Sequence, residues 1–212
     1  MSGQRNDGQD TAPRSSRIVV TVVAATLALS LLVVVGSAPA AAQTEIDSCT
    51  TIDSSGSYRL NQSVTQSVDS PCIVIQADDV TFDGEGHTID YPGDSRGSPG
   101  IDVDNGTGGL SNVTVRDVRV EGFFFGVQYR RVDDGRIEDV ETANNDDAIF
   151  VFEGRNTTIR NATTEGVISV GDPDHLVTRS TVTGSSDPLS TGISVDSNAT
   201  VRHSAVRKMG TG

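Results

Sequence analysis

The chain has 212 residues, which is enough for one domain with a targeting segment. Its formal net charge of -13 argues against a nucleic acid partner, because phosphate binding needs clustered Lys and Arg. Hydrophobic residues make up 35% and aromatic residues 4%, with no Trp, which excludes a thick globular core. The acids are mainly Asp (22, against 7 Glu) and Lys208 is the only lysine, a balance that favours a salt-adapted, halophilic surface.

The N-terminus has the pattern of a targeting segment. Residues 1–17 are polar and are predicted to form a disordered n-region, and residues 18–42 form an uncharged apolar stretch that ends in small residues. With Arg14 and Arg17 in front, this predicts a signal peptide cleaved after Ala42. The apolar stretch is also long enough to span a bilayer, so an uncleaved anchor helix is the alternative. In both cases this segment engages the membrane during export, and the remaining chain is predicted to be secreted or on the cell surface.

Two cysteines remain after the apolar segment, Cys49 and Cys72. An even number in an exported chain favours one disulfide, which would close a loop of about 24 residues and contribute about 3 kcal/mol. Two free thiols are the alternative. A zinc site is not indicated, since His87, His175 and His203 show no ligand spacing.

After a predicted capping segment at 43–71, five segments share one pattern: Asn or Asp, a small residue, an apolar anchor and then polar residues. The anchors are Phe82, Val115, Ile137, Ile159 and Val201, and a weaker copy places Thr178 between the last two. From Val115 onward the anchors lie 22, 22, 19 and 23 residues apart. The first step is 33 residues long and contains the polar stretch 91–100, which predicts a lateral loop.

A second pattern keeps step with the first and places apolar residues two apart. Such alternation predicts short strands with one inward and one outward face. The predicted inward pairs are Ile101/Val103, Val127/Tyr129, Ile149/Val151, Ile168/Val170 and Ile193/Val195. No segment after residue 42 shows helical periodicity.

Short strands at a period near 22 residues are typical of a parallel β-solenoid, in which each rung buries its apolar face against the next. Rungs stack about 4.8 Å apart, so a core one Ile/Val layer wide needs few aromatics. We therefore predict an all-β parallel β-helix of about six rungs over residues 72–212. A β-sandwich is the alternative, but it does not predict one register that recurs five times.

A polar column follows the anchors by two positions. We expect it to point inward and to bond the backbone of the next rung. Its predicted members are Asp117, Asp139, Asn161, Ser180 and His203.

The repeat resembles the right-handed parallel β-helix superfamily, which has the pectate-lyase-like fold. The order of Cys49, Cys72 and the turn Asp83-Gly84-Glu85-Gly86-His87 is similar to the opening segment of secreted archaeal β-helix proteins. Those proteins are grouped with the carbohydrate-binding-and-sugar-hydrolase (CASH) repeat and with NosD, a periplasmic copper-accessory protein. The resemblance covers residues 46–212 and implies a right-handed β-helix, while the superfamily carries many functions.

The chemistry of the chain is less specific than its fold. Asp102 and Asp104 alternate along one strand and are both expected to face outward, where they predict either a Ca²⁺ site or a solvated acidic face. Residues 144–147 (NNDD) match one polygalacturonase motif, but its G-H-G and R-I-K motifs are missing. Copper would need more Met, His or Cys ligands than Met209 and the scattered histidines. We therefore assign no catalytic residue and expect no cofactor.

The outward aromatics are the most informative residues for function. If Ile149 and Val151 point inward, Phe150 and Phe152 point outward beside Gln128 and Arg130. Such a group suits stacking on a sugar ring. The alternative is that the segment 123–125 (FFF) folds over these rings.

The chain contains six N-x-S/T sequons. Asn61 and Asn105 lie outside the regular rungs and are the predicted N-glycosylation sites. Asn112, Asn156 and Asn198 share one repeat position and are explained by the bend they occupy, and Asn161 belongs to the column expected to point inward.

These features favour an exported cell-surface module that binds polysaccharide or another surface component without catalysis. The alternatives are a polysaccharide lyase or glycoside hydrolase on the same fold, and a structural envelope spacer. The chain stops at RKMGTG without a visible cap, which predicts either a fragment or end-to-end self-association.

Overall fold

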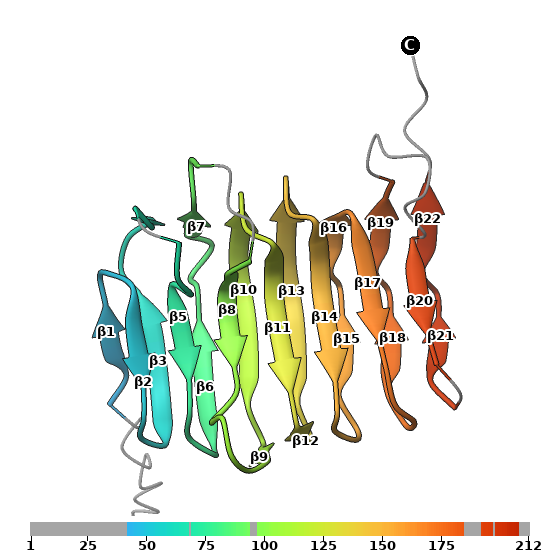
Figure 1. Cartoon of the computed structure of the whole chain (residues 1–212), viewed down its shortest axis with the longest axis horizontal. Coiled ribbons are helices and arrows are strands. Elements are labelled where there is room, and N and C mark those ends of the chain that lie inside the picture. Colours follow the sequence, from blue (N-terminus) through green and yellow to red (C-terminus); the bar gives the residue numbers. More distant parts are fainter. Residues whose placement is uncertain (1–41, 68, 94–96, 185–191, 197, 208–212) are drawn as a thin grey trace, which may run out of the picture. The chain divides into compact units, whose positions relative to one another are not determined.

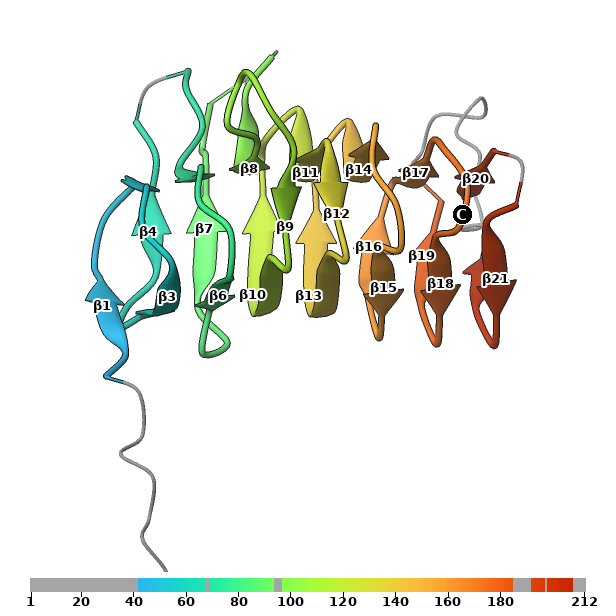
Figure 2. The same cartoon turned by 90° about the horizontal axis from the view of Figure 1, so that it is seen from below.

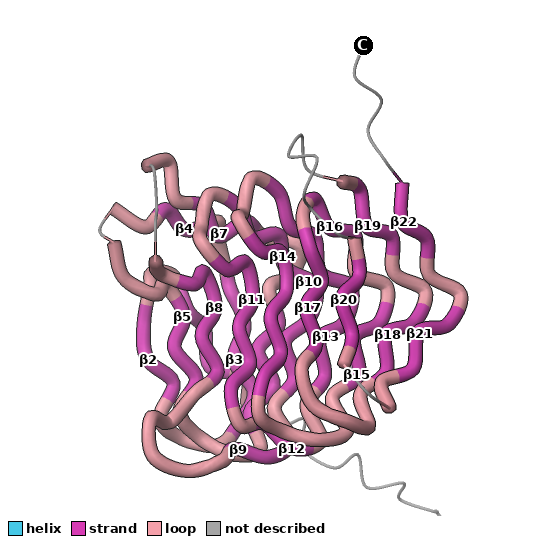
Figure 3. The backbone as a smooth tube through the Cα atoms, turned by 45° about the vertical axis from the view of Figure 1, so that its right-hand side comes forward, coloured by secondary structure: helices cyan, strands magenta, loops and turns pink. Residues whose placement is uncertain are grey.

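The computed structural model describes residues 42–67, 69–93, 97–184, 192–196 and 198–207. Within these residues every regular element is a β-strand, and the strands stack as rungs of a parallel solenoid (Figures 1 and 3). The predicted parallel β-helix is therefore confirmed. Residues 1–41, with the predicted n-region and most of the signal or anchor, lie outside the described residues, as do Lys208, Met209 and the last three residues. No helix in the described part is long and apolar enough to cross a membrane.

One sheet, here called sheet I, takes a strand from each rung, and its neighbouring strands are parallel. The described residues give it seven strands, one more than the expected six rungs, because part of the predicted cap already pairs as a rung. In spatial order these are β2 (Thr50–Ile52), β5 (Ile73–Ile75), β8 (Pro99–Val103), β11 (Phe125–Arg130), β14 (Asp147–Phe152), β17 (Val167–Val170) and β20 (Ile193–Val195).

The second sheet, sheet II, bends along its strands into two halves and is seen from its own side in Figure 2. Its first half is β1 (Thr44–Ile46), β3 (Gly56–Leu60), β6 (Val80–Asp83), β10 (Thr114–Glu121), β13 (Arg136–Ala143), β15 (Thr158–Arg160), β18 (Leu176–Thr178) and β21 (Thr200–Arg202). The long strands β10 and β13 continue into the second half, which also holds β4 (Val64–Thr65), β7 (Thr88–Asp90), β16 (Thr163–Glu165), β19 (Thr181–Thr183) and β22 (Ala205–Arg207). A short pair, β9 (Leu110–Ser111) and β12 (Val132–Asp133), lies apart from both sheets.

The core is a thin stack of apolar side chains between the sheets. The inward pairs predicted for β8, β11, β14 and β17 are all buried, and they lie in register from rung to rung. Each fully buried Ile or Val side chain contributes about 1.5–3 kcal/mol. Tyr129 adds a polar atom to this core, and its hydroxyl donates to the carbonyl oxygen of Arg136 at 2.9 Å.

The last predicted pair behaves differently. Ile193 is half-buried and Val195 is 37% exposed. In the described residues β20 is the final strand of sheet I, so no further rung covers these side chains.

The anchor in the weaker repeat copy is Val177, not Thr178. Val177 is buried and lies in register between Ile159 and Val201. Thr178 instead aligns with Arg160 and faces outward. Because strand side chains alternate, a shift of one residue exchanges the inward and outward faces.

The polar column expected inside the solenoid lies on its surface. Asp117, Asp139, Asn161 and His203 are exposed and have left-handed backbone angles, with φ of 48–54°. They bend the chain between the two halves of sheet II, where Asn and Asp are tolerated better than most residues. Their side chains do not bond inner backbone, and the Asn161 amide donates to Asp139 Oδ1 at 2.9 Å.

Ser180 does not belong to that column. In its rung the left-handed bend position is occupied by Arg179, with a φ of 53°. The Ser180 side chain is buried. Its hydroxyl oxygen accepts from the backbone N–H of Ala162 in the neighbouring rung at 3.3 Å. The expected bond to a neighbouring rung's backbone therefore exists at Ser180, one position further along the chain.

A second left-handed bend alternates acid and amide through successive rungs, and we call it the Asp/Asn column. The amides of Asn112 and Asn156 donate to Asp79 and Asp134 at 2.8 and 3.3 Å. This bend explains why three sequons share one repeat position. Its members, all with positive φ, are Asp79, Asn112, Asp134, Asn156, Asp174 and Asn198.

The outer face of sheet II carries alternating charges, here called the charge column. Each arginine bonds the acid of the preceding rung, with N–O distances of 2.6, 2.7 and 3.1 Å. The acidic composition is therefore partly organised into ion pairs. In rung order the column is Glu45, Arg59, Asp83, Arg116, Glu138 and Arg160.

The predicted disulfide between Cys49 and Cys72 is present. It ties the residue before β2 to the residue before β5, so the covalent link crosses from one rung to the next. The backbone N–H of Thr50 donates to the Cys72 carbonyl oxygen at 2.8 Å beside it.

Candidate functional site

The outer face of sheet I aligns four side chains in a line across four rungs. Asp102, Gln128, Phe150 and Ser169 are direct neighbours in register, and we call them the outer row. They face away from the core because the residues on either side of each are the inward pairs. Neighbouring strands lie about 4.8 Å apart, so the row is a straight, evenly spaced track.

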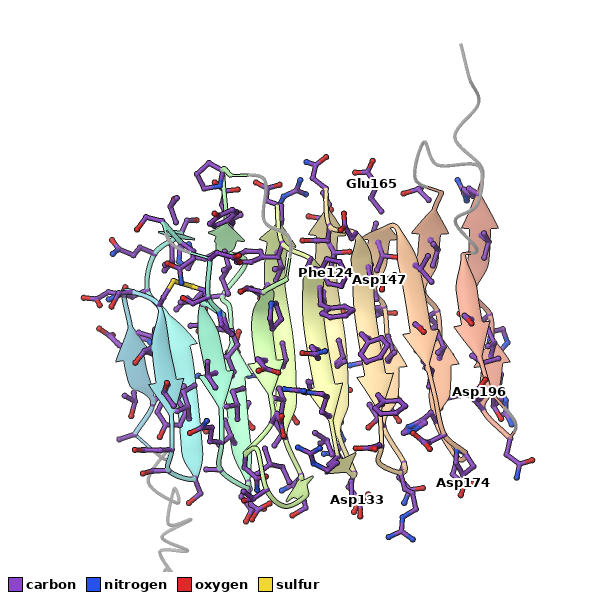
Figure 4. The ribbon with its side chains drawn as sticks, viewed as in Figure 1. Phe124, Asp133, Asp147, Glu165, Asp174 and Asp196 are labelled. Atoms are coloured by element: carbon purple, nitrogen blue, oxygen red, sulfur yellow. A yellow bond between two sulfur atoms is a disulfide. The ribbon has the colours of Figure 1, made fainter. Side chains whose placement is uncertain are left out.

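An aromatic strip runs over the same strands. Phe124, Phe125, Phe150 and Phe152 contact one another in that order, with ring centroids 4.6, 4.9 and 6.0 Å apart. Phe150 and Phe152 are stacked, and Phe152 is 43% exposed. Figure 4 shows Phe124 at the end of the strip next to Asp147, whose backbone N–H donates to the Phe124 carbonyl oxygen at 2.8 Å.

The segment 123–125 extends the strip instead of covering it. Phe123 turns inward, is buried and packs against Tyr91 at 5.8 Å. Phe125 lies against Phe150, while Phe152 at the other end stays exposed. The rings therefore form a continuous, partly exposed apolar surface.

Asp104 is held by two arginines on this face. Its side chain is 5% exposed, and it pairs with Arg130 at 2.7 Å and with Arg131 at 2.6 Å. Arg131 also pairs with Glu153 at 3.3 Å and donates to the Gly108 carbonyl oxygen at 3.1 Å. Asp104 faces outward as expected, but the expectation of a solvated carboxylate is wrong, because two guanidinium groups cover it.

Asp102 is the unusual acid of the outer row. Its side chain is 14% exposed, and its Oδ2 lies 3.9 Å from Arg130. Its Oδ1 is buried and accepts no hydrogen bond in the described part of the chain. Burial raises the pKa of Asp102 to about 6, against the opposing effect of Arg130 and with a smaller contribution from Asp104. This carboxyl therefore exchanges its proton near neutral pH.

No three His, Cys, Asp or Glu side chains gather in a metal-binding arrangement within the described residues. Asp102 and Asp104 offer little to Ca²⁺, because Ca²⁺ takes six to eight oxygen ligands and the Asp104 oxygens already bond arginines.

Several polar groups of the face have no protein partner in the described residues. The Gln128 amide, the Ser169 hydroxyl and the Asp147 carboxylate accept or donate no side-chain hydrogen bond there. Burial raises the pKa of Asp147, and neighbouring Asp146 raises it further. Ser169 and Asp147 are half-buried and Gln128 is 8% exposed, so a polar ligand laid along the aromatic strip reaches the first two side chains more fully than the Gln128 amide.

The NNDD motif has a structural role in part. Asn145 is buried, accepts from the backbone N–H of Phe123 at 2.9 Å and donates to the Val120 carbonyl oxygen at 3.0 Å. It fixes the turn that presents Phe124 and Asp147. Asn144 has a left-handed φ of 54°, and Asp146 is exposed.

Two of the hollows in the described residues lie on other parts of the solenoid. One of about 290 Å³ follows the bend at Asp117, Asp139 and Asn161 and includes Arg119 and Glu141, which pair at 3.2 Å. One of about 590 Å³ lies between the loops that carry Arg131, Asp133, Glu153 and Asp172. Both are lined by several charged groups and hold no aromatic ring, and a third hollow of about 270 Å³, beside β1, β2 and β3, includes Tyr58 but no arrangement of stacked rings. They suit a sugar chain less well than the outer face of sheet I.

The predicted glycosylation sites differ in their surroundings. Asn61 is exposed, as expected for an acceptor. The Asn105 side chain closes a local turn, accepting from the Gly108 N–H at 2.8 Å and donating to the Gly109 carbonyl oxygen at 3.3 Å. Asn161, expected to be inaccessible, is exposed at its bend.

Sequence reasoning identified Phe150, Phe152, Gln128 and Arg130, and the structure brings all four together on one face. It missed Phe125 as part of the same strip. Parity counted from Val127 places Phe125 inward, whereas its ring packs against the outward Phe150, with ring centroids 4.9 Å apart. The run of three phenylalanines was the available signal.

The chain matches no protein-family model, no curated protein and no solved structure.

Proposed function

We propose that this chain is an exported cell-surface module that binds a carbohydrate chain on the outer face of sheet I, without catalysis. The observation that carries the proposal is the stacked, partly exposed pair Phe150 and Phe152 beside Gln128 and Ser169, whose side chains have no hydrogen-bond partner among the described residues. Flat rings bind the apolar faces of sugars, and the free Gln128 and Ser169 groups suit their hydroxyls.

Export is supported by two features. The apolar segment 18–42 has the pattern of a signal or anchor, and the Cys49–Cys72 disulfide belongs to an oxidising compartment. The repeat also resembles secreted archaeal β-helix proteins of the NosD and CASH type. A surface location would bring the track into contact with envelope or environmental polysaccharide.

A glycan-binding measurement on the full chain tests the proposal. Phe150→Ser should weaken binding to a retained polysaccharide about tenfold, because truncating a central aromatic anchor costs about 1.4 kcal/mol or more. Val201→Ser is the matched control, since Val201 is 42% exposed and lies on sheet II. Equal binding by Phe150→Ser, Phe152→Ser and wild type would contradict the proposal.

Hydrolysis on the same face is the second candidate, and Asp102 is the observation that favours it. A carboxyl with a pKa of about 6 is suited to act as a general acid. New reducing ends released from a bound polysaccharide, and lost in Asp102→Asn, would establish the enzyme. Retention without product supports the binding module.

A further inference from the structure

We infer that the outer face of sheet I selects a neutral, hydroxyl-rich glycan and rejects polysaccharides that carry carboxylate or sulfate groups. This inference rests on the proposed function, and it names the ligand class of the same site. It follows from how the charges of the face are already used.

The cations of the face are engaged by the protein. Arg130 is the single basic residue on the described strands β8, β11, β14 and β17, and it lies between Asp102 and Asp104. Arg131, which follows β11, bonds Asp104, Glu153 and the Gly108 carbonyl through its three nitrogens. An anionic ligand would have to replace these internal partners.

Acids outnumber bases around the track. Asp102, Asp104, Asp147 and Glu153 face two guanidinium groups, so the ionised site has an excess of two negative charges. The whole chain has a net charge of -13, which adds a repulsive field of the same sign. A uronate placed on Phe150 would lie two rungs, or about 10 Å, from the Asp102 carboxyl, a distance over which like charges still repel at about 0.1 M salt.

The unengaged groups are those that suit hydroxyls. The Gln128 amide both donates and accepts, the Ser169 hydroxyl does the same, and the Asp102 carboxylate accepts. Since Asp102 Oδ1 is buried, a ligand approaches this residue through Oδ2. A sugar hydroxyl would donate to this Oδ2, whose ion-pair partner in the described residues is the Arg130 guanidinium at 3.9 Å.

The test compares neutral and acidic oligosaccharides of equal length on the full wild-type chain. The probes are hexasaccharides of glucose and mannose in several linkages, against hexagalacturonate, at pH 7.5 and about 0.1 M salt. We expect at least one neutral probe to bind tenfold or more tightly than hexagalacturonate. The ratio of neutral to hexagalacturonate affinity should fall at about 1 M salt. There the Debye length is roughly 3 Å, so the repulsion between the acidic site and the acidic probe is screened.

The double variant Asp102→Asn/Asp147→Asn sharpens the test. It keeps the shape of both side chains and removes two negative charges, so the affinity for hexagalacturonate relative to the neutral probes should rise, whatever the change in neutral affinity from losing the Asp102 carboxylate as an acceptor. The matched control is Asp117→Asn, at the exposed bend of sheet II, which should change neither affinity. Circular dichroism shows whether the double variant is folded. If it is not, the affinities of the wild-type chain for neutral probes and for hexagalacturonate decide the test alone.

The outcomes separate the two proposals. Equal or tighter binding of hexagalacturonate by wild type would overturn the neutral-glycan inference and keep the proposed function. Binding of neither class, with Phe150→Ser indistinguishable from wild type, would overturn both.

Discussion

The outer faces of the two sheets use their polar residues in opposite ways. On sheet II the charge column pairs its arginines with the acids of preceding rungs, at 2.6 Å for Arg59–Glu45 and 2.7 Å for Arg116–Asp83. On sheet I the outer row leaves the Gln128 amide and the Ser169 hydroxyl unpaired in the described residues and adds four phenylalanines. The same rungs thus build one face whose charged groups pair with one another and one whose outer row keeps some polar groups without a protein partner in the described residues.

The difference shows how a solenoid can give its two outer faces different polar chemistry. Side chains on the two outer faces never meet, because the thin core lies between them. Polar groups on sheet II can therefore be optimised for one another while those on sheet I stay available. The three predictions below test this separation, beginning with the core that both faces share.

The largest effect is expected for a cavity in the shared core. Ile149→Ala, beneath the aromatic strip, should lower the free energy of unfolding by about 2–5 kcal/mol, and Ile137→Ala beneath the charge column should do the same. Urea unfolding at constant salt measures both. Ser169→Ala is the control on the same face, and a loss below about 1 kcal/mol for either isoleucine would show that the core tolerates gaps.

Smaller changes in the free energy of unfolding, of opposite sign, are expected when Asp83 on sheet II and Asp102 on sheet I are each replaced by Asn. Asp83 bonds Arg116 at 2.7 Å and accepts from the Glu85 N–H at 3.0 Å, so Asp83→Asn should cost about 1–2 kcal/mol at pH 7. Asp102 has a pKa of about 6, above its ordinary value of 3.8, so the folded state holds this proton more tightly than the unfolded state. Its ionisation therefore destabilises the fold above pH 6, by up to about 3 kcal/mol, and protonation relieves this as the pH falls toward 4.

Asp102→Asn should accordingly stabilise the protein at pH 7 and leave its stability unchanged near pH 4. Denaturation of wild type and both variants at pH 4, 5, 6 and 7 measures the difference. If Asp102→Asn destabilises as much as Asp83→Asn at pH 7, the two faces are not built differently.

The smallest effect is expected at His175, which is buried between two loops. Its Nδ1 accepts from the Thr157 N–H at 3.1 Å, and burial lowers its pKa despite the opposing charge of Asp172. A lowered pKa means that the unfolded chain binds the proton more readily. Stability from this group is full above pH 6.5 and declines as the pH falls below it.

His175→Gln should remove that decline between pH 6.5 and 5, with glycan binding unchanged at pH 7.5. Chemical denaturation in this window measures it, using His203→Gln at the exposed bend as control. An identical pH slope in wild type and His175→Gln would contradict the assignment.

The sequence predicts the fold well because the inward residues repeat. The pairs from Ile101/Val103 to Ile168/Val170 lie where their alternation places them, and the disulfide follows from an even cysteine count. The orientation of the polar columns is more difficult to predict. An Asp such as Asp117 or Asp139 is compatible both with an inward ladder and with an outward left-handed bend, so residue type does not distinguish them. The shift from Thr178 to Val177 arises because this rung is shorter than the two before it, with 18 residues from Ile159 to Val177, and a displacement of one residue exchanges the faces of a strand.

The site is predictable only in part, for a similar reason. Alternation places Phe150 and Phe152 outward, but the covering of Asp104 depends on arginines whose reach no spacing reveals. The ion pairs decide whether an acid is solvated, buried or available, and they come from different rungs.

The Asp/Asn column and the charge column share a period of two rungs, and this constrains how the gene can change length. Loss of a single rung, such as the one with Asn112 and Arg116, would bring Asp79 next to Asp134 and Asp83 next to Glu138. Loss or duplication of two consecutive rungs would keep donor beside acceptor and cation beside anion in both columns. Length variants of this protein are therefore expected to differ by pairs of rungs, although the fold itself is built one rung at a time.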